Sequence, residues 1–222
     1  MKSMTRLGVT MNWILKGEES ILSFINKIGQ LIIVTVLWLI SCLPIITIGT
    51  ACSAMYYTVV KVIRREHGYL HKEYMKAFKR NIKNGCIFTI GFIIWGLILY
   101  LNRGYVGHEG TLKSRYFILI YDVLIAITIG MAVYLFPNLS RFKLKNLELI
   151  KMSLHMAFRN LPITLLLIAG TFLCMIAIWF LPIFMTLLIP GFWCYTSSFL
   201  IEKVLKFYMA KPIDGEELWF YQ

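Results

Sequence analysis

The feature that most constrains this chain is a run of 33 residues, Ile28–Val60, without a charged side chain. One straight helix of that length would measure about 50 Å, whereas the hydrocarbon core of a bilayer is about 30 Å thick. Pro44 and Gly49, near the middle of the run, permit a turn. The run therefore predicts a membrane hairpin, with one span at 28–46 and a shorter span at 48–64.

Further apolar runs follow along the chain, and each is nearly free of charge: Cys86–Leu101, Tyr116–Pro137, Leu161–Leu181 and Ile183–Ile201. Pro190 and Gly191 predict that the last of these helices is bent or broken. The composition agrees, because 59% of the residues are hydrophobic and only 15% are charged, whereas about a quarter are charged in soluble domains. We therefore predict an all-α polytopic transmembrane helical bundle of about six spans. A re-entrant or cytoplasm-protruding helix at 48–64 would reduce the number to five.

The domain organisation predicted from these runs is a single integral membrane domain, 1–222. It has an amphipathic cytoplasmic segment at 1–27, a membrane bundle at 28–201 and a cytoplasmic tail at 202–222. The first segment is not a cleavable signal peptide, because charged residues interrupt it and it has no convincing cleavage site.

Basic residues are distributed unequally between the two sides of this arrangement. With six spans and the N-terminus inside, the inner segments hold twenty Lys and Arg residues and the outer loop 102–115 holds three. Such a positive-inside bias predicts that both termini are cytoplasmic. The same distribution explains the net charge of +12 without nucleic acid as a partner, since the basic residues lie between spans. The lipid bilayer is the expected partner.

Two inner segments have the periodicity of basic amphipathic helices. In 70–84, the apolar face is expected to hold Leu70, Tyr74, Ala77, Phe78 and Ile82, and in 144–160 it is expected to hold Leu147, Ile150, Leu154, Ala157 and Phe158. Their basic residues are candidates for contact with the inner leaflet or with a cytoplasmic partner: Lys72, Lys76, Lys79, Arg80, Lys83 and Arg159. Membrane-surface anchoring is the favoured interpretation.

Asp122 is the one acidic residue well inside a predicted span, about six residues from its outer end. Intramembrane acids are often functional, so Asp122 is a candidate ion-coupling residue. The favoured alternative is an interfacial acid paired with Arg115 or Arg103.

Small residues at four-residue spacing predict close helix packing at Gly49 and Ser53 and at Ala126 and Gly130. Nothing in the sequence points to catalysis, since it contains no metalloprotease, nucleophile-elbow, Walker A or dinucleotide-binding motif. The five cysteines include no C-x-x-C pair, and Gly68 lies between His67 and His71, which have no suitable third ligand. We therefore expect no catalytic residue, cofactor or metal, and a chain that is not an enzyme.

Residues 38–85 carry a resemblance to a known family. The turn LPIITIG, the start of the second span at Ala54-Met55-Tyr56-Tyr57 and the segment KEYMKAFKRN are similar to the YesL-like family of bacterial integral membrane proteins. The family has no established biochemical activity and defines no catalytic residues. It is commonly encoded beside carbohydrate ABC importers. The resemblance therefore implies a multi-pass protein of the bacterial cell membrane near such transporters.

Two functions are consistent with these features. The favoured one is a non-enzymatic accessory or scaffold protein associated with a carbohydrate ABC uptake system, with importer subunits as partners. The alternative is a small-solute transporter or channel. A polar mid-membrane cavity containing Asp122 would favour transport, and a filled apolar bundle would favour the accessory role.

Overall fold

The computed structural model describes residues 2–107, 112–142, 144–180 and 183–209, and it describes side chains from Leu22 onward, except 108–113, 143 and 181–186. The helices are α1 (Lys2–Cys42), η1 (Ile45–Thr47), α2 (Ile48–Thr58), η2 (Val59–Arg64), α3 (Leu70–Gly107), α4 (Leu112–Arg141), α5 (Asn146–Arg159), α6 (Leu161–Phe180) and α7 (Ile183–Tyr208). The described part contains no strand. The all-α prediction is therefore confirmed.

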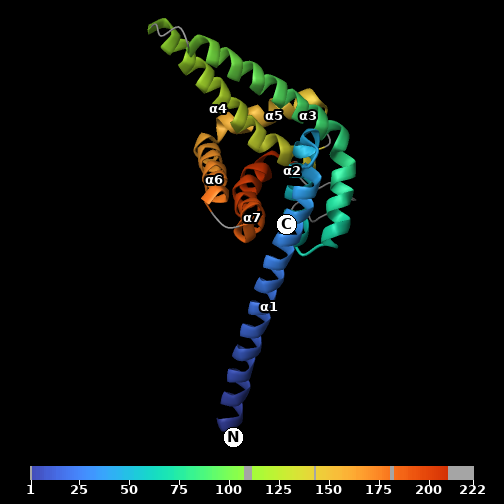
Figure 1. Ribbon diagram of the computed structural model, residues 1–222. Helices are drawn as coiled ribbons and strands as arrows, with labels where there is room; N and C mark the ends of the chain where they lie inside the picture. Colours follow the sequence, from blue (N-terminus) through green and yellow to red (C-terminus); the bar gives the residue numbers. More distant parts are fainter. Residues whose placement is uncertain (1, 108–111, 143, 181–182, 210–222) are drawn as a thin grey trace.

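Among the residues that the structure describes, five helical stretches are long and apolar enough to cross a membrane: Leu22–Cys42, Ile45–Arg64, Leu70–Gly107, Ser114–Arg141 and Leu161–Phe180. These stretches match the first five predicted spans. The sixth predicted span lies in α7, whose described part does not reach the same apolar threshold. In Figure 1, α2 runs opposite to α1, and α3 bends after its first part, so that the rest of α3 and the returning α4 run obliquely to α1.

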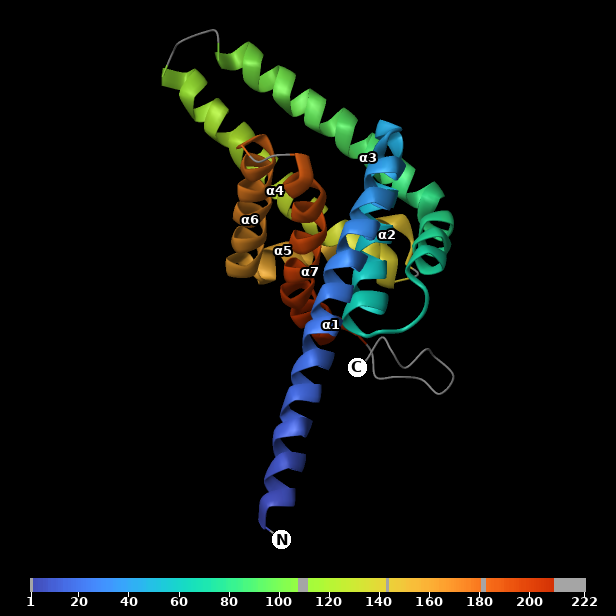
Figure 2. The same cartoon turned by 60° about the horizontal axis from the view of Figure 1, so that its bottom comes forward.

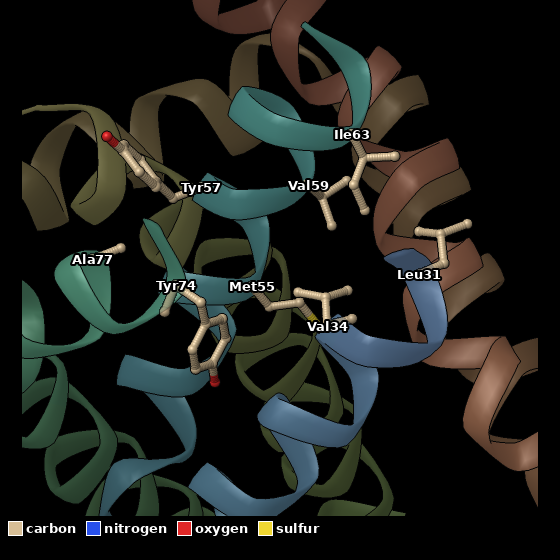
Figure 3. Packing of buried hydrophobic residues seen from close by; sticks show 9 residues of the cluster. Leu31, Val34, Met55, Tyr57, Val59, Ile63, Tyr74 and Ala77 are labelled. Carbon is tan, nitrogen blue, oxygen red and sulfur yellow. The ribbon is translucent and has the colours of Figure 1, made fainter. Parts of the chain in front are cut away.

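The α2–η2 unit is the centre of the bundle. In the most apolar part of its span, 72% of the residues are buried by the rest of the protein. In the other four candidate spans, the corresponding share is 11–22%. Leu31 and Val34 of α1 pack on one side of it, and Tyr74 and Ala77 of α3 pack on another (Figure 3). This segment is therefore surrounded mostly by other helices, so it can be only moderately apolar. For this reason its sequence pattern left open whether it crosses the membrane.

The hairpin of α3 and α4 projects away from the other helices, as does the N-terminal half of α1 (Figures 1 and 2). In contrast, α6 and α7 lie beside each other next to the upper half of α1 (Figure 2). The two helices of the hairpin contact each other along their length, from Arg80 and Ser140 at one end to Arg103 and Asp122 at the other.

Two predicted helix boundaries are wrong. Segment 70–84 is not a separate helix but the first part of α3, and α1 runs without interruption from Lys2 to Cys42 through the predicted boundary at residue 27. At Pro190, where a bent or broken helix was predicted, α7 continues without a break. The preceding turn of a helix can adjust to one missing donor when neighbouring helices hold it in place. The next residue is Gly191, where an added Cβ would lie 2.8 Å from the Leu31 carbonyl oxygen of α1, so α7 and α1 approach each other closely there.

The predicted apolar face of 144–160 is also wrong in part. Helix α5 confirms the helix itself, but Leu147 and Phe158 are exposed, at 71% and 51%. The buried face consists of Leu149, Ser153, Met156 and Ala157. Likewise Ile82 of α3 is 42% exposed, whereas Asn81 beside it is buried. In both segments a polar side chain is buried because it forms a hydrogen bond at that position.

Candidate functional site

The most concentrated polar arrangement among the described residues surrounds Glu202 of α7. Its Oε1 accepts a hydrogen bond of 2.8 Å from the Tyr56 hydroxyl and another from Arg141, and its Oε2 lies 3.0 Å from Arg65. The side chains of Arg141 and Glu202 are 1% and 4% exposed. We call these four residues the Glu202 cluster, and it joins α2, the end of η2, α4 and α7.

The buried charges of the Glu202 cluster compensate one another. Two guanidinium groups share one buried carboxylate, and burial lowers the pKa of Arg65, while the charge of Arg141 lowers it further. A buried ion pair contributes little net stability, but removal of one partner leaves an uncompensated charge and is costly. The cluster can therefore fix the relative positions of four helices. The Glu202 cluster was not predicted from the sequence. A single acidic residue within a mostly apolar helix is, however, a pattern that indicates such a buried site.

A second set of contacts joins α2–η2 to the first part of α3. Lys61 donates to the Tyr57 hydroxyl at 3.3 Å and to Glu73 at 3.0 Å. The Arg80 guanidinium lies 4.9 Å from the centre of the Tyr57 ring and donates to the Ser140 carbonyl. Asn81 donates to Ser53 at 3.0 Å. The predicted contact residue Arg80 is therefore directed toward α2 and α4.

Asp122 lies on α4 and forms an ion pair of 2.6 Å with Arg103 of α3. The two side chains are 51% and 44% exposed. Arg103 is one of the two partners predicted for Asp122 from the sequence. The ion pair lies on the projecting hairpin and not in the interior of the bundle. No charged residue occurs between Lys83 and Arg103 on α3, or between Asp122 and Arg141 on α4. At 1.5 Å per residue each interval measures about 28–30 Å, close to the thickness of a hydrocarbon core.

The remaining predicted contact residues fall into two groups. Lys72, Lys76, Lys79 and Lys83 are all exposed on α3. Arg159, at the end of α5, lies 4.6 Å from the centre of the Phe207 ring and 6.0 Å from that of Tyr208. The lysines are therefore available to lipid or a partner, whereas Arg159 helps to hold the C-terminal end of α7.

Some of the predicted packing residues lie at close helix contacts, and one does not. A Cβ on Gly49 would lie 2.3 Å from the Phe136 ring, so α2, α3 and α4 meet closely there. Ser53 bonds to Asn81, and Gly130 lies against Thr164 of α6. Ala126 is exposed. The sequence analysis missed Gly85, where a Cβ would lie 2.3 Å from Thr50 Oγ1 and 2.9 Å from Thr50 Cα.

An open groove of about 430 Å³ separates α1 from the linker after η2. Ser23, Asn26, Lys27 and Gln30 of α1 line one side, and Glu66 on the other side pairs with Lys27 at 3.3 Å. Among the residues that the structure describes, no three His, Cys, Asp or Glu side chains come together as metal ligands would. The groove therefore offers polar contacts from both of its sides.

Comparison with known proteins identifies one family. Residues 31–103 match the family described as "Protein of unknown function, DUF624". The matched region runs from Leu31 on α1, through α2, to Arg103 near the C-terminal end of α3. It includes the segment 38–85, in which the sequence resemblance lies. No curated protein and no solved structure matches the chain.

Proposed function

We propose that this chain is a YesL-like integral protein of the bacterial cell membrane that serves as a non-enzymatic accessory or scaffold subunit of a carbohydrate ABC uptake system. The match to DUF624 over residues 31–103 supports the membership. The neighbourhood implied by the YesL-like resemblance supports the partner.

The observation that carries the proposal is the position of Asp122. An ion-coupled transporter needs a polar residue where solute and ions pass, near the middle of the bundle. Asp122 instead lies half exposed on the α3–α4 hairpin and is paired with Arg103. The buried charges of Lys61, Arg141 and Glu202 join helices to one another. These contacts favour a scaffold over the alternative of a small-solute transporter or channel.

The α3–α4 hairpin supplies the surface that a scaffold requires. Its exposed apolar side chains include Ile94, Leu97 and Leu101 on α3, at 54%, 55% and 59% exposure. Because the outer part of the hairpin projects from the other helices (Figure 2), these side chains are available to another membrane subunit. Helices associate in lipid through such close apolar contacts.

We also propose that both termini are cytoplasmic. The contacts of Arg65, Arg141 and Glu202 bring the ends of η2, α4 and α7 together, and the Lys27–Glu66 pair brings α1 to the same end. The positive-inside bias assigns this end to the cytoplasm.

The experiment is purification of the tagged full-length chain from its native membranes in a mild detergent, followed by mass spectrometry. We expect carbohydrate importer subunits to be retained, and Leu97→Trp on the hairpin to reduce their yield at least severalfold. Leu165→Trp is the matched control, because Leu165 of α6 is 64% exposed on another helix. Retention of no transporter subunit would contradict the proposal. Solute uptake by the purified chain alone in proteoliposomes, abolished by Asp122→Asn, would favour the transporter instead.

A further inference from the structure

The groove between α1 and the linker after η2 has charged or polar side chains on both of its sides. Four residues of α1 line one side, and they recur at intervals of one helical turn on one face of the helix: Ser23, Asn26, Lys27 and Gln30. Glu66 lines the other side and pairs with Lys27 at 3.3 Å. We call this feature the α1–η2 groove. Its volume of about 430 Å³ lies within the range of about 300–1,000 Å³ that is typical of small-molecule sites.

The backbone beside the α1–η2 groove has two unusual features. Helix η2 is a π-helix, a rare form that occurs frequently at functional sites. The φ angle of Glu66 is +54°, in the left-handed region that glycine adopts freely and that is unfavourable for a residue with a Cβ. The linker is held in this shape, because the His67 amide donates to the Lys61 carbonyl at 3.0 Å. Strained residues that the surrounding structure holds in place are concentrated at binding sites, so the strain indicates a role for the Glu66 carboxylate.

The two charged residues of the groove have opposite signs and lie on opposite sides of it. The side chains of Lys27 and Glu66 are 35% and 71% exposed, so their ion pair contributes little to stability and each can bind another group instead. Lys27 has a flexible stem that can turn toward an anion. Arg64 and Arg65, which precede Glu66, bond to α7. The groove therefore matches a ligand that carries one negative and one positive group.

The face of α1 that lines the groove continues into an apolar surface. Helix α1 is uninterrupted and runs straight in both views (Figures 1 and 2). Beyond Gln30, the same face carries Ile33, Leu37 and Ile40, and the two isoleucines are 53% and 59% exposed. After Lys27, α1 contains no charged residue, so this part of the face contacts the hydrocarbon of the bilayer. The α1–η2 groove therefore lies at the level of the head groups of the lipids that cover this face.

We propose that the α1–η2 groove binds a phosphoethanolamine group, which is supplied by phosphatidylethanolamine of the surrounding bilayer. Lys27 and the amide of Asn26 bind the phosphate, and Glu66 binds the ammonium. The acyl chains lie along the apolar continuation of the same face of α1. Phosphatidylcholine has the same charges, but its quaternary ammonium has no N–H group to donate to a carboxylate. The contact with Glu66 therefore selects phosphatidylethanolamine over phosphatidylcholine.

The test uses the full-length chain in a neutral detergent, with dioleoyl phosphatidylethanolamine and dioleoyl phosphatidylcholine in equal amounts, and native mass spectrometry to count bound lipids. We expect phosphatidylethanolamine to be preferred about threefold to tenfold, as for one charge-assisted hydrogen bond at a partly exposed site. Glu66→Gln should abolish this preference. Lys27→Gln should weaken the binding of both lipids, since both carry the phosphate, and Lys27→Arg should keep it.

A further variant separates lipid binding from folding. Glu66→Gly relieves the left-handed conformation, so it should leave the melting temperature unchanged or raise it, and it should still abolish the preference. A purely structural role of Glu66 would instead lower the melting temperature. The matched controls are Glu148→Gln and Lys151→Gln, which change exposed residues of α5 and should leave lipid binding as it is.

Three results would overturn the proposal. The first is equal binding of the two lipids by the unsubstituted protein. The second is a preference that persists in Glu66→Gln, or that Glu148→Gln reduces as much. The third is displacement of the bound lipid by free glycerophosphoethanolamine, which would identify a site for a soluble compound. None of these results depends on whether importer subunits are retained during purification.

Discussion

The guanidinium of Arg65, at the end of η2, lies 3.0 Å from the carboxylate of Glu202 on α7, although 137 residues separate them in the sequence. Arg141 of α4 bonds to the other oxygen of the same carboxylate. Three helix ends therefore depend on one acidic side chain. This relationship makes Glu202 the most informative residue for a test of the fold.

Replacement of Glu202 by Ala should destabilise the protein by about 3–5 kcal/mol, because it leaves two buried guanidinium groups without their carboxylate. For a chain of this size, the melting temperature should fall by roughly 6–20 °C. Thermal unfolding in detergent micelles measures the change. The neighbouring Lys203→Ala is the control, because Lys203 is exposed and its loss should shift the melting temperature by no more than about 2 °C. Equal melting temperatures for the two variants would show that the cluster does not join the helices.

Replacement of Gly85 by Ala should separate α2 from α3. The added Cβ would lie 2.9 Å from the Thr50 backbone, and such overpacking costs about 1–3 kcal/mol or more. Gly91→Ala lies on the same helix, with no atom within 4 Å of its added Cβ. This control should be neutral or stabilising by about 0.5–1 kcal/mol, since Ala favours helix. The prediction fails if both variants change thermal stability in the same direction by the same amount.

Replacement of Asp122 by Asn should leave the fold almost unchanged, because an ion pair between two exposed side chains contributes little to stability. Thermal unfolding of Asp122→Asn, of Arg103→Gln and of the double variant measures the coupling between the two residues. A double variant that is clearly non-additive with the two single variants would mean that lipid or protein shields the pair from water.

The proposed topology makes a prediction for reporter fusions. A fusion after Lys145, in the linker between α4 and α5, should be active as a cytoplasmic reporter. A fusion after Gly107, at the end of α3, should be active only as an extracytoplasmic reporter. The same location for both fusions would contradict the hairpin of α3 and α4, whose two charge-free intervals each match the thickness of the hydrocarbon core.

The sequence by itself determined the fold class and the positions of the long apolar helices. Charge-free runs such as those within α3 and α4 are sufficient for this, because charged side chains are costly in hydrocarbon and their absence is visible in one dimension. The ion pair of Asp122 with Arg103 was also accessible from the sequence, since a hairpin brings the adjacent ends of two successive spans together.

Only the tertiary structure decided which polar residues are buried. Asn81, Ser153 and Glu202 occupy interior positions that an apolar periodicity assigns to other residues, because partners distant in the sequence satisfy their hydrogen bonds. It also showed that 70–84 and the following span form one helix. Burial of a polar group depends on what lies opposite it, and a one-dimensional pattern does not contain that information.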